Sequence, residues 1–310
     1  MESSGTAAAA ATVQRPSLDQ LGLSLGKKAR MHRLLYEHGL KNGTLLILPI
    51  DQGLEHGPVD FFPNPPSADP EFQWRLAVEG NYNGIACHYG LARKYMDRFA
   101  GQVPLVLKVN GKTNIPSDDD ALSTLTGSVE DAVALGADAV GYTLYVGSTR
   151  QDEDFLQLQV IREDCDKYGM PLIVWSYPRG APIGDKGGRD SLYAIDYAAR
   201  VALEAGADIV KLNMPKHGPK DAEQPGGYGD IDFSYEEGAR RVVASAGRCL
   251  VLFSGGSKLG DDDLLNKARV SMEAGAVGLI FGRNMWQRPY QEALAITARV
   301  KQDVLGRFPG

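Results

Sequence analysis

Short apolar runs rich in Val, Ile and Leu recur along the chain, each bounded by turn-forming residues. Runs of this length and composition predict β-strands. Their hydrophobicity is nearly continuous rather than alternating, which is typical of strands covered on both faces in a parallel sheet. The runs are Thr44–Ile50, Gly84–Tyr89, Pro104–Asn110, Ala139–Val146, Pro171–Tyr177, Asp208–Met214, Cys249–Ser254 and Val277–Gly282.

Helical patterns, with apolar residues three and four positions apart, lie between these runs. Three of the joins from helix to strand resemble one another: Leu135-Gly136-Ala137-Asp138, Ala205-Gly206-Ala207-Asp208 and Ala274-Gly275-Ala276-Val277. Glycine at such a join predicts a left-handed residue that ends the helix. The chain therefore repeats a βα unit. We expect helices at Val129–Leu135, Phe155–Tyr168, Ser191–Ala205, Tyr235–Ala246, Asp262–Ala274 and Tyr290–Leu305.

Eight parallel strands alternating with helices in a chain of 310 residues predict an α/β fold of the (β/α)8 TIM-barrel type. The main alternative is an open doubly wound sheet, but no Gly-x-Gly-x-x-Gly follows the first strand. Residues 17–310 are expected to form a single barrel domain. Ser17 to Leu40 would be its N-terminal helical extension, packed outside the barrel or across its bottom.

Residues 1–16 are expected to form a disordered tail. Met1 to Thr12 are rich in Ala and Ser and lack the basic region and apolar segment of a secretory signal. Arg15 is the one basic residue among the first 25, which argues against a transit peptide.

Composition excludes several classes of function. The net charge of −6 argues against a nucleic-acid surface, and no apolar run approaches the length that spans a bilayer. Cys87, Cys165 and Cys249 are far apart and lack the spacing of metal ligands. Three isolated cysteines suit a reducing compartment, so we expect a cytoplasmic protein.

Lys211 stands out because it follows the apolar residues Ile209 and Val210 on a predicted buried strand. A buried ammonium loses its hydration, so the amine must either pair with a carboxylate or fall in pKa and become a nucleophile. The pairing alternative would use Asp51 or Asp208.

The neighbours expected in a barrel favour the nucleophile. Trp175 and Tyr177 lie on the adjacent strand, and Lys108 points into the same lumen. A second cation and an apolar wall both lower the pKa of an amine. Asp51 places a carboxylate at the same mouth. Taken singly, Tyr177 would be a core aromatic and Asp51 a turn residue, but barrels carry their active groups at this end.

The last two strands end in a pattern typical of phosphate binding. Ser254, Gly255 and Gly256 offer unobstructed backbone N–H groups, and Gly282 and Arg283 add another bare N–H and a guanidinium. Barrels often bind phosphate here, where helix N-termini also favour anions. A turn that needs glycine only for its geometry would explain Gly255 and Gly256 but not Arg283.

At these residues the chain resembles class I fructose-1,6-bisphosphate aldolase of the archaeal and bacterial type. The resemblance runs from about Leu45 to about Leu305. It is carried by Leu48-Pro49-Ile50-Asp51-Gln52-Gly53-Leu54-Glu55-His56-Gly57, Val174-Trp175-Ser176-Tyr177-Pro178-Arg179-Gly180, Asp208-Ile209-Val210-Lys211 and Gly282-Arg283-Asn284.

The resemblance implies a Schiff-base lyase that needs no metal or other cofactor and acts on sugar phosphates. Lys211 would form the imine, and Tyr177 would be the general acid/base. Asp51 would lie near the substrate hydroxyls, and Trp175 would line the site. Substrate binding would fall to Lys108, Ser254, Gly255, Gly256, Gly282 and Arg283. No nucleic-acid or membrane partner is implied, and a homo-oligomer is expected.

Three alternatives remain at this level. A sister Schiff-base enzyme would run a transaldol transfer in aromatic amino-acid precursor synthesis or act as a sugar-phosphate thiolase. A non-catalytic barrel that binds phosphosugars would keep the glycines without needing Lys211 and Tyr177 together. A metal-dependent aldolase is disfavoured because the five histidines show no clustered ligand spacing.

Overall fold

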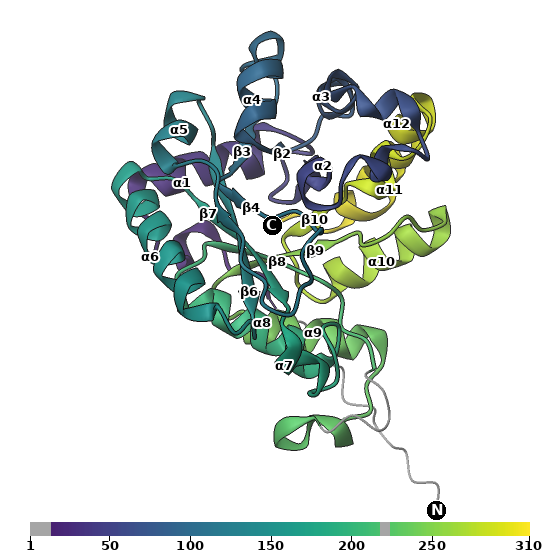
Figure 1. The fold of residues 1–310 in the computed structure, drawn as a ribbon. Coiled ribbons are helices and arrows are strands. Elements are labelled where there is room, and N and C mark those ends of the chain that lie inside the picture. Colours follow the sequence, from purple (N-terminus) through teal and green to yellow (C-terminus); the bar gives the residue numbers. More distant parts are fainter. Residues whose placement is uncertain (1–13, 218–223) are drawn as a thin grey trace, which may run out of the picture.

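The computed structural model describes residues 14–217 and 224–310. Within these ranges eight parallel strands close a barrel, in the order β1-β10-β9-β8-β7-β6-β3-β2, and Figure 1 shows helices surrounding it. The predicted TIM barrel and all eight predicted strands are confirmed. The strands are β1 (Leu45–Pro49), β2 (Gly84–His88), β3 (Leu105–Lys108), β6 (Ala139–Val146), β7 (Leu172–Pro178), β8 (Ile209–Leu212), β9 (Leu250–Ser254) and β10 (Gly278–Ile280).

The six predicted helices are confirmed with small shifts at their ends. They are α5 (Val129–Ala134), α6 (Gln151–Tyr168), α8 (Leu192–Glu204), α9 (Tyr235–Ser245), α10 (Asp261–Glu273) and α12 (Tyr290–Arg299). Gly136, Gly206 and Gly275 have φ of 69°, 94° and 96°, the left-handed geometry expected where a helix turns into a strand. After α12 the chain continues to Val304 in the wider turns of a π-helix.

Shorter elements escaped the hydrophobic pattern because they carry few apolar repeats. The helices among them are α2 (Gln52–Glu55), α3 (Pro70–Glu79), α4 (Tyr89–Tyr95), α7 (Ala181–Gly184) and α11 (Arg283–Trp286), whereas α1 (Leu25–His32) lies within the predicted N-terminal extension. A small antiparallel pair, β4 (Asn110–Gly111) with β5 (Thr124–Leu125), follows β3. No helix within the described ranges has both the length and the apolar content that a bilayer crossing requires.

The N-terminal helix closes the bottom of the barrel, one of the two positions predicted for it. Met31 and Leu34, on α1 and just after it, pack fully buried against the lumen-facing Leu45 and Val277 at the starts of strands. Lys27 Nζ lies 2.9 Å from Asp208 Oδ2, and Arg33 pairs with Asp138. Both aspartates come from the repeated helix-to-strand joins, so these joins hold the N-terminal helix.

The predicted disordered tail, residues 1–16, falls mostly on residues 1–13, which lie outside the described residues. The elements from Leu18 to Arg307 belong to the barrel and its covering helices. The domain boundary at residue 17 stays a prediction.

Candidate active site

Lumen-facing side chains change from apolar to polar toward the C-terminal ends of the strands. Side chains two residues apart on a strand share a face, so Ile173, Trp175 and Tyr177 of β7 form a column that rises through the lumen. On the neighbouring β8, Ile209 lies below Lys211, and the register pairs Trp175 with Lys211. The amine of Lys211 therefore lies above an apolar floor, as the sequence predicted.

Lys108, at the end of β3, is the centre of a buried ion-pair cluster. Its side chain is fully buried, and its Nζ lies 3.2 Å from Asp51 Oδ2, donates to Thr143 Oγ1 at 2.8 Å, and pairs with Glu55 of α2. Burial lowers the pKa of Lys108, but the carboxylates of Glu55 and Asp51 outweigh it and raise the pKa well above its ordinary value. Lys108 therefore keeps its charge.

Lys211 has the opposite environment. Lys211 is 5 % exposed, and no carboxylate of the described residues lies within 4.0 Å of its Nζ. The amine lies 5.1 Å from the centre of the Trp175 ring and 5.5 Å from that of Tyr177. Burial, together with the positive charge of Lys108, lowers the pKa of Lys211 to about 8, although the carboxylate of Asp51 acts in the opposite direction.

The pairing alternative for Lys211 is not what the structure shows. Asp208 bonds Lys27 at the bottom of the barrel, and Asp51 bonds Lys108. Burial raises the pKa of Asp51, but the charges of Lys108, Lys211 and His88 outweigh it and lower the pKa to about 2. Asp51 is therefore an anion beside an amine that a neutral pH leaves partly uncharged.

Tyr177 faces the cavity next to Lys211. Burial, with the nearby charges of Asp51 and Glu55, raises the pKa of Tyr177 well above its ordinary value. The hydroxyl accordingly carries its proton across the physiological range and can donate it to a bound group. Arg179 places its guanidinium 5.3 Å from the centre of the same ring.

Trp175 forms the floor beneath both amines. It is fully buried, and Lys108 Nζ lies 5.0 Å from the ring centre. The ring fits because residue 141 on β6 is glycine. A Cβ at Gly141 would lie 2.7 Å from a Trp175 ring carbon and 3.2 Å from Lys108 Cγ.

A cavity of about 670 Å³ opens above these groups, lined by Asp51, Tyr177 and Lys211. One end is the predicted phosphate cradle, since Ser254, Gly255, Gly256, Gly282 and Arg283 all line it. Among the described residues, the N–H groups of Gly256 and Gly282 have no hydrogen-bond partner. The helix after Arg283 is a single turn, so free N–H groups and the guanidinium rather than a long helix dipole make this end attractive to an anion.

The other end of the cavity carries a second group of cations. Lys112 and Arg179 both bind Asp118, at 2.9 Å and 3.1 Å, and Arg189 also lines the wall. The glycine-rich loop 179–189 thus brings Arg179 and Arg189 to the cavity, whereas Lys186 is not among the described lining residues. The cavity has positive groups at both ends and an amine between them.

The model of the DeoC/LacD family aldolases matches residues 45–288. The chain belongs to this family. It is 41% identical over 267 residues to the class 1 fructose-bisphosphate aldolase of Thermoproteus tenax, covering 86% of this chain and 91% of that protein. It is 38% identical over 253 residues to the class 1 enzyme of Halobacterium salinarum, covering 82% of this chain and 88% of the other.

Solved structures agree. An archaeal fructose-1,6-bisphosphate aldolase, whose catalytic lysine is bound to the carbinolamine intermediate of its substrate, is 37% identical with a TM-score of 0.75, over 88% of this chain and 99% of the other. A fructose-bisphosphate aldolase from Slackia heliotrinireducens is 27% identical with a TM-score of 0.79, over 93% and 92%. The predicted resemblance to class I fructose-bisphosphate aldolases is confirmed.

Lys108, expected to bind substrate, and Trp175, expected to line the site, lie below the cavity surface of this aldolase. Lys108 and Trp175 are fully buried and are not among the described lining residues. Lys108 Nζ already binds three partners, so its geometry suits a fixed charge rather than a substrate contact. Trp175 lies under Lys211 and buries it.

Sequence reasoning missed three polar residues of the aldolase site. Glu55, four residues after Asp51 on the one-turn helix α2, was within reach of a spacing argument. The residues around Thr143 contain no motif that would indicate a role in the site. Lys267 of α10 reaches the cradle from outside the barrel, where its Nζ donates to the Gly255 carbonyl at 3.1 Å. Burial, together with the charge of Lys216, lowers the pKa of Lys267 to about 8.

Proposed function

We propose that this chain is a class I fructose-1,6-bisphosphate aldolase with Lys211 as its imine-forming residue. The observation that carries the proposal is an amine of lowered pKa, about 8, on the floor of a cavity with cationic groups at both ends. An amine with this pKa is partly neutral near pH 7 and can attack a carbonyl. The identity to class 1 aldolases supports the same reaction.

In the cleavage direction the neutral amine of Lys211 adds to the C2 carbonyl of the open-chain ketose. Loss of water from the carbinolamine gives an iminium, which accepts electrons. When the C4 hydroxyl loses its proton, the C3–C4 bond breaks and its electron pair moves toward the iminium. Glyceraldehyde 3-phosphate leaves, and the enamine gains a proton at C3 and is hydrolysed to dihydroxyacetone phosphate. No cofactor enters this balance.

The two candidate proton groups differ in protonation, which assigns them different tasks. Tyr177 holds its proton because of burial, so we assign it the donation of a proton to the leaving water. The resulting phenolate then takes the proton of the C4 hydroxyl, and the phenol passes it to C3 of the enamine. Asp51, with a pKa lowered to about 2, stays ionised and accepts hydrogen bonds from the C3 or C4 hydroxyl. Lys108 fixes Asp51 and lowers the pKa of Lys211.

A bisphosphate fits the two cationic ends of the cavity. We assign the C1 phosphate to Gly256, Gly282 and Arg283, with Ser254 and Gly255 completing the loop. The C6 phosphate would bind Lys112 and Arg179, which both pair with Asp118. This second cationic end favours the bisphosphate over the sister enzymes, and a panel of keto sugar phosphates with and without the second phosphate tests it.

Borohydride trapping tests the proposal directly. Reduction in the presence of dihydroxyacetone phosphate should add a fixed mass on the peptide that contains Lys211. Lys267 is a matched control, because it is a second amine that lines the same cavity and also has a pKa lowered to about 8. Lys211→Arg should lose the adduct, and Lys267→Arg should keep it. An adduct on Lys267 alone, or none, would overturn the assignment.

Two further expectations belong to this proposal. Light scattering after size exclusion would test the expected homo-oligomer. The described cysteines are free and buried, which fits the expected cytoplasmic location.

A further inference from the structure

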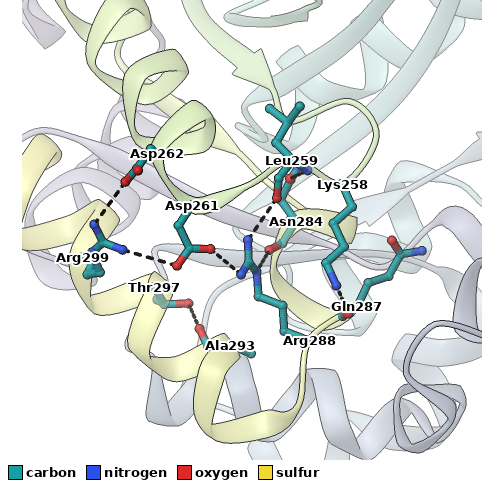
Figure 2. Close-up of polar contacts among 10 residues, drawn as sticks. All are labelled: Lys258, Leu259, Asp261, Asp262, Asn284, Gln287, Arg288, Ala293, Thr297 and Arg299. Carbon is teal, nitrogen blue, oxygen red and sulfur yellow. Dashed lines mark hydrogen bonds and ion pairs between the residues drawn. The ribbon is translucent and has the colours of Figure 1, made fainter.

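Two loops meet at the phosphate cradle, and a polar cluster that includes Asn284, Arg288 and Asp261 joins them (Figure 2). The loop after β9 carries Gly255 and Gly256 and runs on to α10. The second loop, after β10, carries Gly282, passes through the single turn of α11 that begins at Arg283, and runs on to α12. The strands fix the first residues of both loops, since the Gly255 N–H donates to the Ile280 carbonyl at 3.3 Å.

Asn284 fastens the far side of the first loop. Its side chain is fully buried, its Oδ1 accepts from the Leu259 N–H at 2.7 Å, and its Nδ2 donates to the Ser257 carbonyl at 3.1 Å. Both polar atoms of one amide thus bind one loop. The amide packs so close to Gly255 that a Cβ there would lie 2.6 Å from Nδ2.

Arg288 spans the two loops. It is 7 % exposed, and its Nε donates to the Asn284 carbonyl at 2.7 Å while its Nη2 donates to the Leu259 carbonyl at 3.3 Å. Its third contact is Nη1 with Asp261 Oδ1 at 2.6 Å, at the start of α10. A planar guanidinium can hold three acceptors at fixed directions, which a lysine ammonium on a flexible stem does not reproduce.

The cluster leaves the middle of the cradle free. The first loop is fixed at Gly255 by the sheet and at residues 257–261 by Asn284 and Arg288. Between these points, the Gly256 N–H has no partner among the described residues. On the second loop, the Gly282 N–H likewise has no hydrogen-bond partner among the described residues. A preorganised N–H group binds an anion without first breaking a bond or ordering a loop.

We propose that Arg288 and Asn284 are positioning residues that hold the two loops of the cradle at the separation a phosphate requires. Neither lines the cavity among its described residues, so both act through the backbone N–H groups they position. The inference rests on the proposed function, because it takes the group at this end to be the C1 phosphate of the substrate. It predicts that the cluster sets the selectivity for a phosphorylated donor over its unphosphorylated analogue.

The test compares two donors in the condensation direction, dihydroxyacetone phosphate and dihydroxyacetone, with glyceraldehyde 3-phosphate as acceptor. Arg288→Met should raise the KM for dihydroxyacetone phosphate about tenfold, the effect of one charge-assisted hydrogen bond. It should leave kcat and the use of dihydroxyacetone within about threefold, since only the phosphate gains from positioned N–H groups. The inhibition constant of inorganic phosphate should rise with the KM.

Two variants separate positioning from stability. Arg288→Lys keeps the charge beside Asp261 and should restore the melting temperature more than the KM, because an ammonium cannot span both carbonyls. Arg299→Met is the matched control: Arg299 also binds Asp261, at 3.3 Å, but contacts none of residues 255–260 or 282–288, and it should change neither donor's KM. Equal losses with both donors, or a KM that follows the melting temperature across the variants, would refute the proposal.

Borohydride trapping keeps this inference separable from the function on which it rests. With saturating dihydroxyacetone phosphate, Arg288→Met should still form the adduct at Lys211. If the unmodified enzyme formed no adduct, the proposed function would fail, while calorimetric binding of inorganic phosphate to Arg288→Met and Arg299→Met would still decide whether Arg288 positions an anion site.

Discussion

Replacing Glu55 by glutamine should make Lys211 a better nucleophile near neutral pH. Glutamine keeps the size of the side chain and an oxygen that accepts from Lys108, so the buried amine of Lys108 keeps this hydrogen bond. It removes one negative charge from the cluster beside Lys211. Because that charge helps Lys211 to hold its proton, its loss should lower the pKa of the amine from about 8.

The size of the change follows from the geometry. Both amines lie about 5 Å from the centre of the Trp175 ring, and Glu55 touches Lys108, so Glu55 lies no more than about 13 Å from the Lys211 amine. At an effective dielectric constant of about 20, that separation corresponds to about 1.3 kcal/mol, or about one pKa unit. At pH 7 the neutral fraction of Lys211 would rise from roughly a tenth to roughly a half.

The assay is the rate of imine formation at low dihydroxyacetone phosphate, measured from pH 6 to 9 and quenched into borohydride at a single pH. Subsaturating substrate reports the free enzyme. The rate should fall on the acid side with an apparent pKa near 8 for the unmodified enzyme and about one unit lower for Glu55→Gln. Lys108→Met should move this apparent pKa upward, because the removed charge is positive. An apparent pKa that stays near 8 in both folded variants would refute the idea that the cluster sets it.

Three further outcomes are expected. Tyr177→Phe removes the proton donor for loss of water from the carbinolamine and for protonation of the enamine, so kcat should fall by at least about 100-fold and the borohydride adduct at Lys211 should form more slowly. Lys27→Met leaves Asp208 buried without its cation, so urea titration should show the free energy of unfolding lower by about 3 kcal/mol, with kcat unchanged. The lowered pKa of Lys211 means that the unfolded chain binds more protons than the folded one between about pH 8 and 10.5, so stability gains from this group as pH rises through that window. Lys211→Met should abolish this gain, which amounts to about 3 kcal/mol. If the free energy of unfolding changed equally with pH in both proteins, the lowered pKa of Lys211 would be contradicted.

The hydrophobic pattern was enough to predict the barrel because each strand is buried on both faces and each helix on one. The joins through Gly136, Gly206 and Gly275 marked where a helix ends and the next strand begins, which revealed the repeated βα unit. What the pattern missed were α3 and α4, together with the one-turn helices and the pair β4–β5, which are too short to leave a periodic signal. Their positions depend on contacts with distant residues rather than on local preference.

Sequence reasoning placed Lys211 beside Trp175 and Tyr177 because strand order fixes which ends meet. It did not show which carboxylate pairs with which lysine. Lys108 takes both Asp51 and Glu55, and Lys27 takes Asp208, through side chains 57, 53 and 181 positions apart in the chain. Such pairings depend on the direction of each side chain, which residue type and spacing do not specify.

The missing side chain at Gly141 limits how this sequence can change. The Trp175 ring occupies the place where a Cβ at position 141 would lie, so even alanine at this position would push the indole toward the amine above it. A lineage that gained a side chain at 141 would therefore have to replace the aromatic floor in the same step, or first pass through a smaller residue at 175. The volume of one methyl group, remote from any substrate, thus acts as a barrier between alternative floors for the reacting lysine.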